Sequence, residues 1–113
     1  MKRLFVLASV FVLSTLFTCQ AATHTVRLDW VASPTAGVTY DVFRGNAPGT
    51  ESATPIVSGV ALLTYTDAAA GDASCWYVKA KLISGGNTLY SVPSNEVCVN
   101  YPSAPGTLTA TPQ

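Results

Sequence analysis

"CWYVKAKLISGGNTLYSVPSNEVC", residues 75–98, predicts two antiparallel strands joined by a tight turn. Residues 83–88 ("ISGGNT") have the composition of a hairpin tip. If the cysteines at the two ends oppose each other, the midpoint of the strand register falls inside this tip. The cysteine spacing and the turn therefore indicate the same register. The side chains expected to point inward from the first strand are Trp76, Val78, Ala80 and Leu82.

The same register makes further predictions for the returning strand. It places Trp76 opposite Val97 on the inward face, and Tyr77 opposite Glu96 on the outward face. Pro93 lies between these pairs and the tip, and it has no N–H group to donate to the ladder. We therefore expect a bulge or a strand edge at Pro93.

Short alternating runs, broken by Gly, Pro, Asn and Ser, also precede the hairpin, and this pattern is typical of an all-β sandwich. Strands are expected at 25–30 ("TVRLDW"), 38–44 ("VTYDVFR") and 62–67 ("LLTYTD"). Residues 45–55 are expected to form a loop or a weak edge strand. Residues 68–74 ("AAAGDAS") are expected to form a turn or a single helical turn. The side chains expected to point inward are Val26, Leu28, Trp30, Val38, Tyr40, Val42, Leu63 and Tyr65.

Residues 1–21 have the pattern of an export signal. Two basic residues precede an uncharged apolar run of 14 residues, which is too short for a comfortable membrane span. A small-x-small pattern predicts cleavage after Ala21. The alternative is a lipoprotein signal with Cys19 as the lipidated residue, although the residues before Cys19 are larger than is usual at such a site.

Cleavage would leave one small domain at 22–101 and a proline-led segment at 102–113. Four basic and six acidic side chains then give a net charge of −2, without the basic stripe that nucleic acid binding needs. No second apolar run could span a membrane, so we expect a secreted protein in an extracellular or periplasmic compartment. Cys75 and Cys98 would be the remaining pair in an oxidising environment, which predicts a disulfide on the outward face of adjacent strands.

Five stretches resemble, in order and spacing, strands B, C, E, F and G of a fibronectin type III domain. They are "VRLDW" (26–30), "VTYDVFRG" (38–45), "TYTD" (64–67), "CWYVKAKL" (75–82) and "SVPSNEV" (91–97). The resemblance implies an antiparallel β-sandwich of the fibronectin-III or immunoglobulin type. It also implies that Trp30 is the core tryptophan of strand B and that Trp76 replaces the usual strand F tyrosine. The paired cysteines depart from the family pattern, and nothing similar to strand A precedes Thr25.

The segment 102–113, "PSAPGTLTATPQ", is similar to the proline-led opening and strand A of such a domain. Leu108 and Ala110 alternate with threonines, as in a half-buried edge strand. We expect the segment to fold back beside 25–30 and to complete its own sandwich. The alternatives are strand addition to a neighbouring copy and a flexible remnant of a second repeat.

Residues able to support catalysis or metal binding are few and scattered. His24 is the only histidine, and it is expected to be solvated or frayed near the new N-terminus. No cluster has zinc spacing and no loop has calcium spacing, so we expect no metal, no cofactor and no enzymatic activity. Asp29 and Asp41 could approach each other across neighbouring strands. The acidic residues expected at outward positions or in turns are Asp29, Asp41, Asp67, Asp72 and Glu96.

The first functional hypothesis is a non-catalytic structural or protein-interaction module, whose partner is another extracellular protein or a copy of the chain itself. A subunit of an extracellular assembly joined by strand exchange is a variant of this hypothesis. The alternative is a small carbohydrate-binding module that holds a glycan on the outward aromatics Phe43, Tyr77 and Tyr90. Ordinary cross-strand pairing is the simpler explanation of these aromatics.

Overall fold

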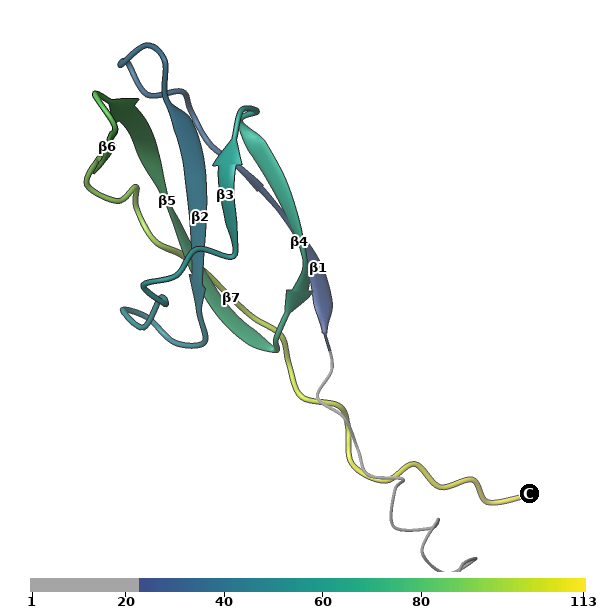
Figure 1. The fold of residues 1–113 in the computed structure, drawn as a ribbon. Helices are drawn as coiled ribbons and strands as arrows, with labels where there is room; N and C mark the ends of the chain where they lie inside the picture. The colour runs from purple at the N-terminus through teal and green to yellow at the C-terminus, as the bar shows by residue number, and fades with distance from the viewer. Residues whose placement is uncertain (1–22) are drawn as a thin grey trace, which may run out of the picture.

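A computed structural model describes residues 23–113, and the expected export signal with Cys19 lies outside the described residues. Seven strands form two antiparallel sheets, which confirms the expected all-β sandwich (Figure 1). The smaller sheet pairs β1 with β4. The larger sheet has the order β3-β2-β5-β6, and β7 also pairs with β5. The strands are β1 (His24–Asp29), β2 (Thr39–Gly45), β3 (Val57–Val60), β4 (Thr64–Ala70), β5 (Ala73–Ser84), β6 (Asn87–Tyr90) and β7 (Val97–Asn100).

The hairpin turns at Gly85 and Gly86, whose φ angles of 58° and 81° are those that a two-residue β-turn with left-handed residues requires. At the far end of β5, Cys75 pairs with Cys98 and Trp76 with Val97, as the sequence predicted. The long strand β5 therefore spans almost the whole height of the larger sheet (Figure 1).

The returning chain is interrupted between β6 and β7. Four residues of β5 lie between Trp76 and Lys81, whereas six residues lie between their partners Val97 and Tyr90. The two extra residues lie within 91–96, around Pro93, where a bulge or an edge was expected. The ladder hydrogen bonds stop there, and serine side chains and amides keep this segment attached to β5.

Two strand predictions were wrong. The alanines of 68–70 continue β4 as extended chain, because Ala70 pairs with His24 and packs fully buried in the core. Leu63, expected inward, is 41% exposed just before β4, where its carbonyl accepts the backbone N–H of Trp30. The short strand β3 lies in a stretch to which the sequence assigned no strand, and it pairs with β2.

The core lies between the two sheets and is small. Val42, Ala70 and Trp76 are buried at its centre. Trp30 packs at its rim, with its ring 5.6 Å from that of Tyr40. The other side chains packed against the core are partly buried: Val26, Leu28, Ile56, Val57, Tyr65, Val78 and Val99.

The expectation that 102–113 folds back was wrong. This segment forms no strand, is exposed from Pro102 onward, and runs away from the sandwich (Figure 1). The direction of the chain explains why. The Tyr101 ring stacks on His24 with centroids 3.6 Å apart, so the chain leaves β7 at the same end of the sandwich at which β1 begins. Folding back would need the chain to reverse within 102–106, and residues 107–111 would then run parallel to β1.

Candidate functional site

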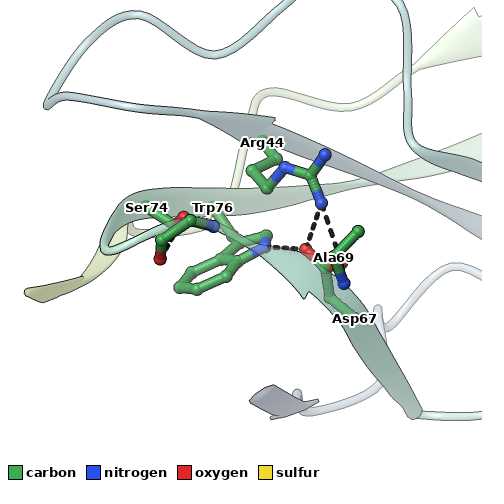
Figure 2. Close-up of polar contacts among 6 residues, drawn as sticks. Arg44, Asp67, Ala69, Ser74 and Trp76 are labelled. Carbon is green, nitrogen blue, oxygen red and sulfur yellow. Dashed lines mark hydrogen bonds and ion pairs between the residues drawn. The ribbon is translucent and has the colours of Figure 1, made fainter. Parts of the chain in front are cut away.

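The carboxylate of Asp67 is the most heavily hydrogen-bonded group in the core (Figure 2). Its oxygens accept from Arg44 Nη1 at 2.8 and 2.6 Å, from Trp76 Nε1 at 2.9 Å, and from the Ala69 amide at 3.0 Å. Asp67 was expected at an outward position or in a turn, and this was wrong, since its side chain is only 4% exposed within β4. The carboxylate ties β4 of the smaller sheet to β2 and β5 of the larger one.

Burial alone would raise the pKa of Asp67, but the hydrogen bonds from Arg44, Trp76 and Ala69 outweigh it and hold the pKa below its ordinary value. A carboxylate that stays ionised and already accepts four hydrogen bonds has little capacity left for a proton or a substrate. The cluster is therefore structural. Alternation contained the signal for it, because Arg44 lies two residues after inward Val42, and Asp67 two residues after inward Tyr65.

Asp41 is a second buried carboxylate, on the opposite face of the larger sheet. It lies on the outward face, as expected, but it is 0% exposed. It accepts from Tyr90 Oη at 2.7 Å, Ser58 Oγ at 2.9 Å and the Gly59 amide at 2.9 Å, and Lys81 Nζ lies 3.3 Å away. Burial opposes its ionisation, yet these partners together keep its pKa below the ordinary value. The cluster fastens β3 and β6 to β2.

Asp29 and Asp41 do not approach each other across paired strands. β1 pairs with β4 and not with β2, so the two carboxylates belong to different sheets. The Asp29 side chain is exposed and accepts from Arg27 Nε at 3.1 Å.

The three aromatics considered for glycan binding do lie together on the outer face of the larger sheet. The ring of Phe43 is 5.3 Å from that of Tyr77 and 6.5 Å from that of Tyr90, and Lys79 Nζ lies over all three rings. However, Phe43 is only 3% exposed, because the two tyrosines and Lys79 cover it. Phe43 cannot stack against a sugar, and Tyr90 is oriented by its hydrogen bond to Asp41.

Cys75 and Cys98 form the predicted disulfide between β5 and β7. The pair lies on the face of β5 opposite to Trp76, as alternation required. Cys75 is nevertheless buried, in a recess lined also by Asn46 and Pro48 of the loop after β2. Among the described residues, Glu96 and these two cysteines make up the one group of potential metal ligands, but the bridged sulfurs are not thiolates.

His24 is not frayed, contrary to expectation. Its Nε2 atom lies 2.8 Å from Asp72 Oδ1, and its ring stacks on Tyr101. The Tyr101 amide donates to the carbonyl of Asp72 at 2.7 Å. These contacts join the start of β1, the β4–β5 turn and the end of β7, so they close the sandwich at this end. Nothing here provides a nucleophile for His24 to activate.

The sandwich is open at the other end of β1, away from His24. A groove of about 360 Å³ separates the end of β1 from the chain around β7, and an adjoining cavity of about 150 Å³ extends it toward Tyr40 and Pro93. The indole Nε1 of Trp30 is buried beside the groove and has no hydrogen-bond acceptor within residues 23–113. The walls of the larger cavity are Leu28, Asp29, Trp30, Val31, Trp76, Tyr77, Val78, Ser94, Asn95 and Val97.

The outer edge of β1 borders this groove and pairs with no other strand of the described chain. The Trp30 amide donates to Leu63, on the β4 side, and the Leu28 carbonyl accepts Thr64 Oγ1 from that side too. Backbone groups alternate in direction along a strand, so those of Arg27 and Asp29 face the open edge. An edge of this kind can accept an extended chain through main-chain hydrogen bonds. Sequence reasoning missed the groove residues 94–97 because their position depends on the interruption around Pro93.

The sequence matches no protein-family model, no curated protein and no solved structure. Within the described part of the chain, no helix is long and apolar enough to cross a membrane. Function is therefore inferred from the geometry of the chain alone.

Proposed function

We propose that this chain is an exported, non-catalytic β-sandwich module of the fibronectin type III kind, which binds a protein partner by strand addition at β1. The free edge of β1 beside an apolar groove is the observation that carries the proposal. A bound strand would satisfy the outward backbone groups of Arg27 and Asp29 and cover the rim of the groove. The disulfide between Cys75 and Cys98 supports export to an oxidising compartment.

The buried carboxylates favour a binding module over an enzyme. Asp67 and Asp41 are both ionised and enclosed by donors, which suits a structural role. The groove itself has one charged side chain in its wall, Asp29, which pairs with Arg27. A mainly apolar groove next to unpaired backbone groups is suited to an extended peptide, whose main chain gives affinity and whose alternate side chains give specificity.

Site-specific photo-crosslinking in the producing cells tests this function. A photoreactive residue at Asp29 should give an adduct with a protein partner, whereas the same residue at exposed Leu62, outside the groove, should not. Arg27→Pro should abolish the adduct, because proline removes an outward N–H while leaving the ladder to β4 intact. Arg27→Ala removes the same charge and should keep the adduct. Absence of any adduct at Asp29 would show that β1 is not a binding edge.

A further inference from the structure

The unpaired edge of β1 and the exposed C-terminal segment complement each other. We propose that residues 107–111 of one copy add as an antiparallel strand to β1 of a second copy, with Leu108 inserted into the groove beside Trp30. This inference rests on the proposed function and names its partner as another copy of the same chain.

The donor segment has the composition of a strand but no sheet of its own. Residues 107–111 ("TLTAT") combine β-branched threonines with Leu108 and Ala110 on one face, and no residue from 102 to 113 is charged. Leu108 is 92% exposed, the highest value among the large apolar side chains of the described chain. Figure 1 shows the segment extended away from the sandwich, and all of its residues from 102 to 113 are exposed.

Chain direction favours a second copy over the same copy. A segment that leaves at Tyr101 and folds back would run parallel to β1, because both start from the end where His24 stacks on Tyr101. Parallel pairs are slightly less stable per residue than antiparallel pairs. The reversal would also have to be completed within 102–106, just after Tyr101, which is fixed by its ring stack and its amide hydrogen bond. A second copy can approach from the other end and pair antiparallel, without any turn.

The acceptor offers what such a strand needs. The outward backbone groups of Arg27 and Asp29 supply two hydrogen-bonding positions along the edge. The groove of about 360 Å³ provides an apolar recess next to them for one side chain. Val31 and Val97, exposed at its rim, would be covered by the neighbouring threonines. A carbonyl of the added strand gives Trp30 Nε1 the acceptor that it lacks within residues 23–113.

Sedimentation velocity of the purified mature chain, from micromolar to millimolar concentration, tests the proposal. We expect a larger species that grows with concentration, since contacts this small belong to the weak class of interfaces. Leu108→Asp should leave a folded monomer throughout, with the disulfide formed, because Leu108 is 92% exposed in the described chain. Leu62→Asp makes the same change at a site 67% exposed and outside the groove, and should assemble like the unaltered chain.

An NMR titration of the full chain provides a second readout. The indole N–H resonance of Trp30, assigned with Trp30→Phe, should shift with protein concentration. That of Trp76, bonded to Asp67, should stay constant. The Trp30 shift should disappear in Leu108→Asp and persist in Leu62→Asp.

Three results would overturn the inference. The first is a monomer at every concentration. The second is an assembly that Leu108→Asp leaves unchanged. The third is a monomer that Leu108→Asp destabilises, which would show that the segment folds back in solution. A monomer that still gives the adduct at Asp29 with a different protein would refute this inference and leave the proposed function standing. A monomer without an adduct would refute both.

Discussion

Asp67→Asn should destabilise the protein strongly, although it changes neither the size nor the shape of the side chain. Every hydrogen-bond partner of the carboxylate is an N–H group: two bonds come from Arg44 Nη1, one from the Trp76 indole and one from the Ala69 amide. An asparagine retains one acceptor oxygen and presents an NH₂ group at the other position. If the oxygen stays with Arg44 and Ala69, the indole of Trp76 faces another donor.

The size of the effect follows from these contacts. A buried donor left without an acceptor costs about 1–3 kcal/mol. Removing one partner of a fully buried ion pair costs about 3–5 kcal/mol. Here Arg44 is 28% exposed, so water replaces part of its lost interaction. We therefore expect the free energy of unfolding to fall by about 2–4 kcal/mol, a large share of the roughly 5–15 kcal/mol typical of a domain.

Urea unfolding at neutral pH, followed by tryptophan fluorescence with the disulfide intact, measures this change. The matched control is Asp72→Asn, because the Asp72 side chain is 58% exposed and pairs with His24. Its effect should stay below about 1 kcal/mol. A double-mutant cycle with Arg44→Met should give a clear coupling energy between Arg44 and Asp67. If Asp67→Asn lies within about 0.5 kcal/mol of the unaltered protein, the cluster does not hold the sheets together.

Three further predictions concern the disulfide, the pH and a close backbone contact. Replacing Cys75 and Cys98 by alanine should lower the free energy of unfolding by about 3 kcal/mol, because the bridge closes a loop with a sequence separation of 23; equal urea midpoints for both proteins would contradict this. Folding lowers the pKa of Asp67, so the unfolded chain binds a proton at this carboxyl more readily than the folded chain does. The free energy of unfolding should therefore fall as the pH drops through the folded-state pKa. Urea midpoints measured across this pH range should fall less in Asp67→Asn than in the unaltered protein. Gly45→Ala should lower the melting temperature, since an added Cβ would lie 2.6 Å from the backbone of Thr50 and Glu51, whereas Gly106→Ala meets open space and should change nothing.

The register of the long hairpin could be predicted only at its disulfide end; near the tip Lys81 pairs with Tyr90, and not with Val92 as a single register through both ends would require. The disulfide fixes one end, the glycines fix the turn, and the period of two fixes which side chains share a face. Cys75 and Trp76 consequently pair as expected. Nothing in this pattern says how many residues the returning chain spends around Pro93. The two extra residues there were foreseen as an irregularity but not in number.

The burial of Asp67 and Asp41 was the main error about side chains, and it has a physical cause. Aspartate is mostly exposed and common in turns, so composition argued against the inward face that alternation gave to Asp67. Burial is tolerable here because the donors come from distant parts of the chain: Arg44 is 23 positions from Asp67, and Tyr90 is 49 positions from Asp41. Such partners become visible only when the strands are placed in sheets.

The fate of the C-terminal segment depends on strand direction more than on its own sequence. Its alternation is typical of an edge strand, but alternation is the same in both directions along a chain. β1 and β7 run in opposite directions, because β1 pairs antiparallel with β4, the short turn at 71–72 reverses the chain between β4 and β5, and β7 pairs antiparallel with β5. The segment after β7 therefore starts where β1 starts, and only another molecule can present it antiparallel to β1 without a sharp turn.

A sheet of two strands is only marginally stable on its own. The polar clusters matter for the open edge because they hold the two-stranded sheet to the larger one. β1 and β4 contribute mostly half-buried side chains to the core, so apolar area alone holds them weakly to the larger sheet. The ion pair of Asp67 with Arg44 and the contacts of His24 with Asp72 and Tyr101 fasten this sheet at fixed points instead. Because these contacts hold the sheet in place, it stays folded although the outer edge of β1 is unpaired. A bound strand then stabilises the folded state by linkage, because it binds an edge that exists only when β1 and β4 are paired.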